Sequence, residues 1–131
     1  MIWQQLNFYI VINFLSKMYI KNTTRKTLLA KDAKLCKNIF SKTLGLMFSR
    51  KIRPLIFIFK KEKIIPLHMF FVFYSIDVLF LNKNKIVIEI KGNFRPFTFY
   101  TPKNKVQYII ELEKNTIKKS KTEIGDKIEF Q

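Results

Sequence analysis

The sequence predicts a mainly β (α+β) protein: a compact antiparallel sheet, folded as a small barrel or sandwich, with one short helix. Of its 131 residues, 48% are hydrophobic and 15% aromatic, and there are only three Gly and four Pro. This composition is typical of a folded chain. Several short segments alternate between apolar and polar residues, which is the pattern of half-buried strands. The turns between them are too short for the crossover helices that parallel strands require.

The most apolar stretch spans residues 67–82, and it contains the only histidine, His68, and an isolated carboxylate, Asp77. Within residues 64–81 the apolar run approaches the length of a membrane-spanning helix, about 18 residues. An aspartate inside such a helix costs about 2.5–3.5 kcal/mol, and the aromatic and β-branched residues favour a strand. We therefore expect no membrane span, and we predict that this stretch forms the central strand region.

Residues 1–17 lie outside the repeating core pattern, and we interpret them as an N-terminal extension. On this interpretation we expect Met18 to be an alternative initiator, followed by a single domain over residues 18–131. The first residues lack the basic segment and the small-residue cleavage site of a signal peptide. The single cysteine, Cys36, excludes an intramolecular disulfide and suits a reducing compartment. The expected location is the cytoplasm.

The first half of the domain contains the predicted helix and a buried strand. Residues 25–36 are predicted to form one or two edge-like strands. Asn38 then caps a helix. Its apolar positions recur three to four residues apart: Phe40, Leu44 and Met47 or Phe48. Pro54 favours an extended chain that enters a buried strand at 55–59. After a polar turn at 60–63, the central stretch pairs back in antiparallel fashion.

The later strands show the clearest alternation. Residues 86–91 follow a hairpin turn at 82–85, and their isoleucines share one face while Glu89 takes the solvent face. A second alternating strand, 106–113, places Glu111 on the solvent face in the same way. The remaining segments are an edge strand or ordered loop at 97–100, a Lys-rich turn at 114–122 and a short final strand at 128–130.

Several short motifs occur in an order that is characteristic of one family. They are TLGLMFSR at 43–50, HMFF at 68–71, IDVLFL at 76–81, YIIEL at 108–112 and GD at 125–126. On these motifs the chain resembles domain of unknown function 192, also known as uncharacterised protein family 0127, in its archaeal-type form. The resemblance covers about residues 25–130. It implies a compact, mainly antiparallel β fold with one short helix, and the biochemical activity of the family is not established. At 72–75 this chain has VFYS where archaeal members usually have Met-Arg-Phe-Pro, so an arginine and a proline are replaced.

His68 and Asp77 are the only pair within the apolar region that is able to act as acid and base. In a continuous strand the two residues have opposite parity and point to opposite faces, unless a bulge intervenes. Asp77 is equally expected to be a structural carboxylate that accepts hydrogen bonds from a neighbouring turn or a helix start. No catalytic residue is therefore assigned, and Asp77 and His68 stay candidates.

A ligand pocket is expected where the helix end meets the central stretch, with Met47, Arg50, His68 and Asp77 as its candidate residues. Met47 is also explained as a core filler at the end of the helix. The single His, the single Cys and the scattered carboxylates show no metal-ligand spacing, and glycine is too sparse for a phosphate-binding loop. We therefore expect no metal and no cofactor.

The formal net charge is +16, from 25 Lys and Arg against 9 Asp and Glu. Such a charge attracts nucleic acid. Lys outnumbers Arg 21 to 4, however, and Arg is the residue that forms bidentate contacts with phosphate and guanine. We therefore expect weak, non-specific nucleic-acid binding. A stacking platform for single strands is a further interpretation, although core packing explains Phe97 and Phe99 equally well. The residues of that platform are Phe94, Arg95, Phe97, Phe99, Tyr100, Lys103 and Lys105.

Three functions stay open on the sequence alone. The first is a small soluble binding or accessory module with an unidentified ligand or partner. The second is a small enzyme in which Asp77, with His68, is the acid or base. The third is a non-specific anion or nucleic-acid binder that acts through its surface lysines. The sequence does not decide whether the protein is an enzyme.

Overall fold

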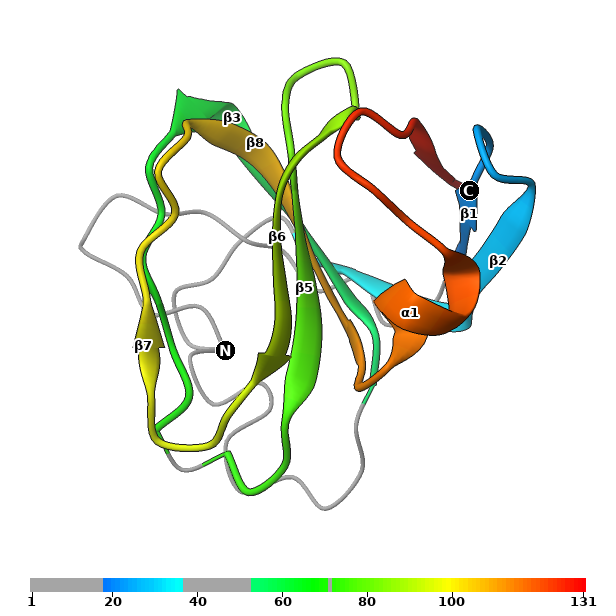
Figure 1. The fold of residues 1–131 in the computed structure, drawn as a ribbon. Helices are drawn as coiled ribbons and strands as arrows, with labels where there is room; N and C mark the ends of the chain where they lie inside the picture. Colours follow the sequence, from blue (N-terminus) through cyan, green and yellow to red (C-terminus); the bar gives the residue numbers. More distant parts are fainter. Residues whose placement is uncertain (1–17, 37–52, 71) are drawn as a thin grey trace.

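A computed structural model gives the structure of the protein for residues 18–36, 53–70 and 72–131. Most of these residues are in strands, and one short helix is present among them, so the predicted fold class is confirmed (Figure 1). The elements are β1 (Met18–Asn22), β2 (Thr27–Cys36), β3 (Leu55–Lys63), β4 (Leu67–His68), β5 (Ile76–Leu81), β6 (Val87–Phe94), β7 (Phe99–Tyr100), β8 (Val106–Glu113), α1 (Thr116–Ser120) and β9 (Ile128–Phe130).

Seven strands form one sheet in the order β6-β5-β8-β3-β2-β1-β9, and β4 and β7 form a second, two-stranded sheet. Neighbouring strands are antiparallel, as predicted, except β2 and β3, which run parallel. The long connection between β2 and β3 gives the chain room for the crossover that a parallel pair needs. The prediction of an edge-like strand at 25–36 is wrong, because β2 lies between β1 and β3. The helix predicted from Asn38, with Met47 and Arg50, lies outside the described residues.

The large sheet curls so that its two edge strands meet at one end. Ile86 and Lys127 form a β-bridge there. Three backbone hydrogen bonds join the same segments: Val87 N to Asp126 O (2.9 Å), Gly125 N to Val87 O (2.8 Å) and Ile128 N to Lys85 O (3.0 Å). In Figure 1 the segment that leads from α1 to β9 passes beside the start of β6. Of the two predicted alternatives, the sheet is therefore closer to a barrel.

Both faces of the large sheet are buried. The even-numbered residues of β5, such as Phe80, belong to one core cluster, which includes Leu67 of β4. Its odd-numbered apolar residues, such as Leu81, belong to a second cluster, which includes Ile20 of β1 and Ile128 of β9. Since successive side chains of a strand point to opposite faces, the second cluster fills the inside of the curl and the first lies between the sheet and β4.

Because both faces of the sheet are buried, two predictions of solvent-facing residues are wrong. Glu89 of β6 is only 8% exposed and Glu111 of β8 only 1% exposed, although the alternating pattern placed both on a wet face. The pattern is misleading here because both faces of the sheet are covered at these positions, in the edge strand β6 as well as in the interior strand β8. Burial raises the pKa of the Glu111 carboxyl above its usual value.

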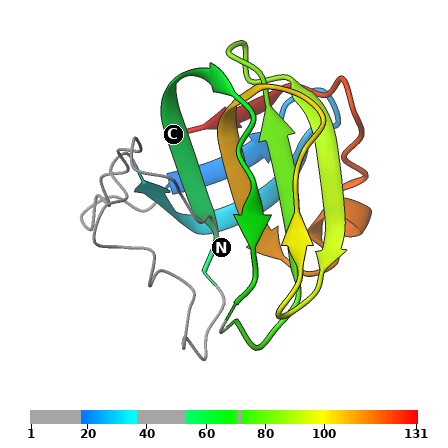
Figure 2. The ribbon, with the colours of Figure 1, turned by 90° about the vertical axis from the view of Figure 1, so that its left-hand side faces the viewer.

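The apolar stretch at 67–82 is not one strand. Leu67 pairs with Tyr100 and His68 with Phe99 in the two-stranded sheet, whereas β5 begins at Ile76 in the large sheet. Figure 2 shows β4 and β7 running side by side. Only β5 is thus a central strand, between β6 and β8. The predicted hairpin at 82–85 is confirmed, because β5 and β6 pair in antiparallel fashion across it.

The helix α1 occupies the segment that was predicted to be a Lys-rich turn. Asn115, in the left-handed conformation (φ 71°), precedes the helix, and Lys121 (φ 57°) follows it. The helix has only five residues, which is too short for a repeated apolar pattern, so its lysine-rich sequence predicted a turn instead. No helix within residues 18–36, 53–70 and 72–131 is long and apolar enough to cross a membrane.

Candidate functional site

Asp77 lies in β5 with its side chain buried, and both of its carboxylate oxygens are engaged. Oδ1 accepts a hydrogen bond from the backbone N–H of Asn93 (3.0 Å), and Oδ2 accepts one from the backbone N–H of Ile117 (3.0 Å). The carboxylate therefore joins three elements: β5, the end of β6 and the first turn of α1. This is the geometry of the structural carboxylate that the sequence left as an alternative.

His68 lies in β4, in the other sheet. Its Nδ1 accepts a hydrogen bond from the Phe70 backbone N–H (3.1 Å), and the two rings lie 5.0 Å apart between centroids. Burial lowers the pKa of the imidazole to about 4, so the ring is neutral at physiological pH. His68 and Asp77 thus lie in strands of different sheets. Met47 and Arg50, the other two candidates, lie outside the described residues.

Glu89 is a buried carboxylate that the sequence analysis missed. It accepts hydrogen bonds from the Tyr100 hydroxyl, the Lys103 backbone N–H (2.9 Å), and the backbone N–H and side-chain Nδ2 of Asn104 (3.2 and 2.9 Å). Burial opposes ionisation of Glu89, but these hydrogen bonds outweigh it and hold its pKa below the usual value. Burial and the same carboxylate raise the pKa of Tyr100 to about 12. Glu89 therefore anchors the loop between β7 and β8 to β6.

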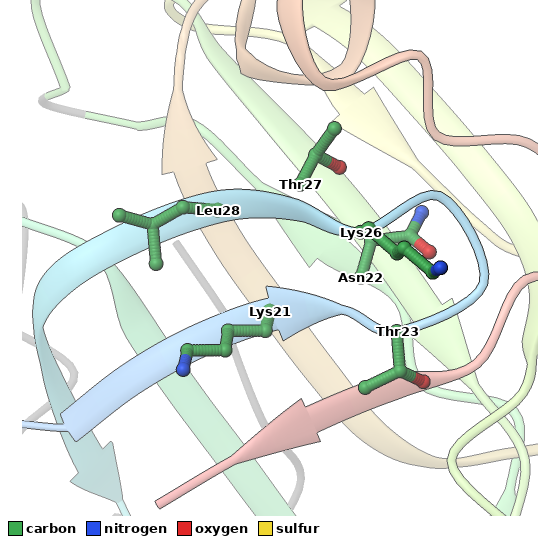
Figure 3. Close-up of a pocket in the computed structure, with 6 residues that line it drawn as sticks. All are labelled: Lys21, Asn22, Thr23, Lys26, Thr27 and Leu28. Atoms are coloured by element: carbon green, nitrogen blue, oxygen red, sulfur yellow. The ribbon is translucent and has the colours of Figure 1, made fainter.

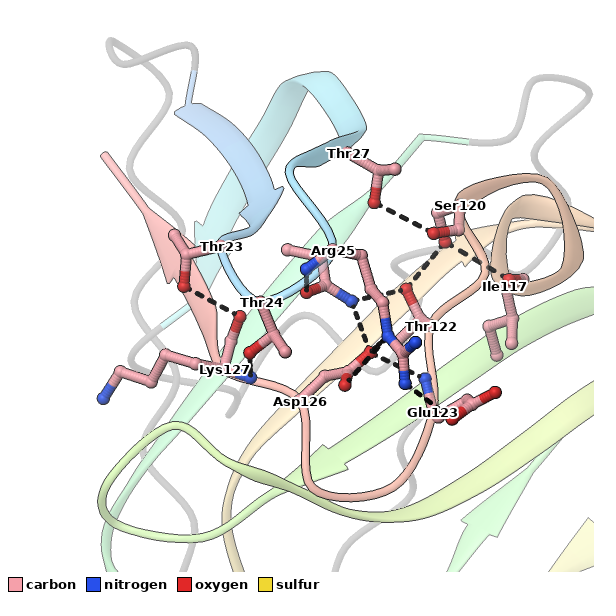
Figure 4. A network of polar contacts seen from close by, with 11 residues as sticks. Thr23, Thr24, Arg25, Thr27, Ile117, Ser120, Thr122, Glu123, Asp126 and Lys127 are labelled. Atoms are coloured by element: carbon pink, nitrogen blue, oxygen red, sulfur yellow. Dashed lines mark hydrogen bonds and ion pairs between the residues drawn. The ribbon is translucent and has the colours of Figure 1, made fainter.

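A second polar network joins the β1–β2 turn to the segment after α1 (Figure 4). The Asp126 carboxylate accepts hydrogen bonds from Asn22 Nδ2 (2.8 Å), Arg25 Nε (3.0 Å) and the Glu123 backbone N–H (2.9 Å). Burial works against the charge on Asp126, yet these donors lower its pKa overall. Asn22 also donates to the Thr122 hydroxyl (3.1 Å). The network is satisfied internally, and it fixes the turn against the barrel wall.

A cavity of about 370 Å³ opens beside this network. Figure 3 shows its lining residues: Lys21, Asn22, Thr23, Lys26, Thr27 and Leu28. The Thr23 and Thr27 hydroxyls donate to the carbonyl oxygens of Lys127 (3.2 Å) and Ser120 (2.9 Å), so their protons are already committed. The two ammonium groups point away from each other (Figure 3). The cavity therefore lacks the converging donors that an anion site requires.

Two pairs of aromatic side chains lie in the two-stranded sheet and in the segments next to it, and we call the four residues the aromatic face: Phe70, Phe73, Phe97 and Phe99. Phe70 and Phe99 form one T-shaped pair (4.9 Å between centroids), and Phe73 and Phe97 form another (5.5 Å). Despite these contacts Phe73, Phe97 and Phe99 are 62%, 49% and 68% exposed. Exposed aromatic residues that lie together are typical of a binding surface.

Hydrogen bonds join the two segments that carry the aromatic face. Met69 N donates to Thr98 O (2.9 Å), and Phe97 N donates to Met69 O (2.7 Å). The Thr98 hydroxyl also donates to Arg95 O (2.6 Å), which closes the turn that carries Phe97. The two segments that supply the rings are therefore fixed relative to each other.

Phe97 is the strained residue of the aromatic face. Its φ is 58°, in the left-handed region, and it follows Pro96 in a tight turn. Glycine or asparagine is the usual residue at such a position, and for most other residues the conformation costs about 1–2 kcal/mol. A bulky aromatic residue at this position is the kind of outlier that marks functional sites.

The aromatic face overlaps only in part with the stacking platform predicted from the sequence. Phe94 is fully buried and Tyr100 is partly buried in the same core cluster, so both serve packing. Phe70 and Phe73, which the sequence interpretation omitted, take their place. Phe97 and Phe99 are exposed, so core packing, which the sequence left as an alternative, does not explain these two residues. Over residues 18–36, 53–70 and 72–131 no group of His, Cys, Asp and Glu side chains is arranged to hold a metal ion.

Comparisons with known proteins agree with the motifs found in the sequence. Residues 20–130 match the model of the DUF192 family, described as uncharacterized ACR. A UPF0127 protein of Thermococcus sibiricus is 34% identical over 113 residues, which are 84% of this chain and 73% of that protein. A UPF0127 protein of Pyrococcus furiosus is 33% identical over 111 residues, which are 83% of this chain and 95% of that protein.

Two solved structures resemble this one closely. A proposed transcription regulator of Sinorhizobium meliloti has a TM-score of 0.75 at 17% identity, and the match covers 97% of this chain and 98% of that chain. A protein of unknown function from Novosphingobium aromaticivorans has a TM-score of 0.74 at 17% identity, with 92% and 91% of the two chains covered. At this level of identity the likeness shows a shared fold.

Proposed function

Because the chain belongs to the DUF192 (UPF0127) family, whose members are uncharacterised, we propose a function from its own structure: a small binding or accessory module that contacts its ligand through the aromatic face. One observation carries the proposal. Phe97 is held in a strained backbone conformation with its ring half exposed. The other non-glycine residues with a left-handed φ in the described part of the chain are lysines and asparagines, so Phe97 is the one that presents a large apolar ring to solvent from such a position.

Three of the buried carboxylates support binding rather than catalysis. Asp77, Glu89 and Asp126 each accept hydrogen bonds from backbone N–H groups, and each joins separate segments of the chain. A general acid or base must reach the proton of a substrate, and these groups point into the fold instead. The enzyme alternative, with Asp77 and His68 as a pair, therefore has less support than the binding module.

A thermal-shift screen of the full chain tests the proposal, because a ligand that binds the folded state raises the apparent Tm. The panel contains metals, nucleotides, sugars, peptides and oligonucleotides. We expect at least one class to raise the Tm of the wild type and of Ile124→Ser, but not of Phe99→Ser. Ile124 and Phe99 are 66% and 68% exposed, so the two variants remove equally exposed apolar side chains. Identical responses of the two variants to every compound would contradict the proposal.

Three further properties are part of the same proposal. The protein acts in the cytoplasm, which suits its single cysteine. It is of the archaeal type, as its relatives in Thermococcus and Pyrococcus suggest. Residues 18–131 form its single domain and residues 1–17 are an extension, a division supported by a family match that begins at residue 20.

A further inference from the structure

We propose that the aromatic face binds single-stranded nucleic acid, with bases stacked on its rings and phosphates held by the basic residues beside it. This inference rests on the proposed function and names the class of ligand. The alternative occupants, a neutral ligand or an anionic membrane, are outcomes of the test below.

The charged residues of the two segments that carry the aromatic face are all basic, and the buried carboxylate of Glu89 contacts one of these segments from β6. The two segments, residues 64–76 and 91–107, contain no Asp or Glu. The second segment carries Lys91, Arg95, Lys103 and Lys105, and the last three of these are exposed. The whole chain carries +16. A phosphate backbone is the ligand that such a surface complements, because cations near phosphates release the counterions of the strand.

The exposed rings supply stacking surfaces, which a purely anionic ligand would not need. Every base has a flat π-surface that stacks on an aromatic side chain, whatever the sequence of the strand. Phe73 and Phe99 keep 62% and 68% of their surface in solvent while each is braced edge-to-face by a neighbouring ring. Braced rings lose little side-chain entropy when a base stacks on them. Bases in a duplex stack on one another, so only an unpaired strand offers these surfaces.

The buried Glu89 holds the backbone at Lys103, one of these basic residues. Its carboxylate binds the backbone N–H groups of Lys103 and Asn104, and it also accepts from Tyr100 in β7. Phe99 is the other residue of β7. Glu89 therefore fixes the backbone of the lysine-bearing loop directly after the strand that carries Phe99.

Fluorescence anisotropy with the full chain tests the inference. The probes are a labelled oligo(dT) and a labelled oligo(rU), each about 12 nucleotides long, and a duplex of equal length, titrated at several salt concentrations. We expect saturable binding of the single strands, weaker binding of the duplex, and a logarithmic salt dependence that grows by about 0.7 per phosphate contact. Equal affinity for duplex and single strand would overturn the inference.

Matched variants separate stacking from charge. Phe99→Ser should weaken single-strand binding roughly 5- to 150-fold without changing the salt slope, whereas Ile124→Ser should bind like the wild type. Replacing Lys103 and Lys105 by Gln should lower the salt slope more than the same change at Lys118 and Lys119 of α1. If Phe99→Ser binds as the wild type does, the affinity comes from net charge alone and the inference is wrong.

The same variants distinguish the failure of this inference from the failure of the proposed function. Binding to vesicles of phosphatidylglycerol and phosphatidylcholine that depends on Phe99, without single-strand binding, would overturn the nucleic-acid ligand and leave a binding module. A Phe99-dependent Tm shift with another class in the screen would have the same meaning. The absence of any Phe99-dependent ligand would overturn both.

Discussion

The carboxylate of Asp77 accepts a hydrogen bond from the backbone N–H of Ile117 at 3.0 Å, across forty residues of sequence. The first N–H groups of a helix have no partner within the helix, and a carboxylate that binds one of them also favours the positive end of the helix dipole. Asp77 thereby holds α1 against the central strand of the sheet. The residue that the sequence marked as a candidate acid is the one that positions the only helix in the described part of the chain.

Replacing Asp77 by Asn should lower the free energy of unfolding by about 1.5–3 kcal/mol. Asparagine keeps one acceptor oxygen, so it can satisfy only one of the two backbone N–H groups of Asn93 and Ile117. Urea denaturation of the variant measures the change. Asp32→Asn is the control, because Asp32 is half exposed and its ion pair with Arg53 is 4.0 Å long, so its effect should stay within about 0.5 kcal/mol. Unchanged stability of Asp77→Asn would remove its structural role and revive the acid–base hypothesis.

Phe97→Gly should be more stable than Phe97→Ala by about 1 kcal/mol. Both changes remove the ring and its contact with Phe73, so the difference between them isolates the backbone conformation at φ 58°. Glycine normally destabilises a folded chain relative to alanine, and only a left-handed position reverses the order. Chemical denaturation of the pair under identical conditions gives the comparison. An alanine variant as stable as the glycine variant would show that the turn carries no strain, and the functional argument from Phe97 would lose its support.

Glu89→Gln should reduce the loss of stability on acidification. The pKa of Glu89 is lowered in the folded state, so its contribution is fully present above the unfolded value of about 4.5 and is lost as pH falls through the lower, folded value. Urea denaturation at neutral pH and at pH values below about 4.5 measures this loss. The glutamine variant should be less stable than the wild type at neutral pH and should approach it in acid. Glu129→Gln, at an exposed position of β9, serves as the control. A constant difference between Glu89→Gln and the wild type at all pH values would contradict the linkage.

The sequence predicts the positions of the strands better than it predicts which of their side chains are buried. Hydrophobic alternation identified the positions of β6, β8 and β9, and the asparagine-containing turn at 82–85 identified the hairpin, because both signals are local. The burial of Glu89 and Glu111 could not be predicted in this way. It depends on β4, β7 and the curl of the sheet, which cover both faces and are set by contacts between distant segments.

The candidate site was predictable only in part, for the same reason. The cluster of aromatic residues at 94–100 is visible in the sequence, but which rings face solvent depends on the pairing of β7 with β4. The positive φ of Phe97 leaves no signal apart from the preceding proline, since a phenylalanine there contradicts the usual turn preference. Asp77 and His68 were paired because they are the only acid–base candidates within the apolar stretch, but β4 and β5, which carry them, belong to different sheets.

His68 should remain unprotonated down to about pH 4, and this is the most direct test of the packing around β4. Burial lowers its folded pKa to about 4 from the ordinary value of 6.5. Between these pH values the unfolded chain binds a proton that the folded chain does not, so stability should fall as the pH drops from 6.5 towards 4. The protein has one histidine, so the imidazole C–H signals in a ¹H NMR titration belong to it without ambiguity. His68→Asn, whose side-chain oxygen can accept the Phe70 N–H in place of Nδ1, should abolish this part of the pH dependence while the fold is kept. A titration midpoint near 6.5 in the folded protein would mean that the ring is exposed to solvent and that β4 does not pack as the structure shows.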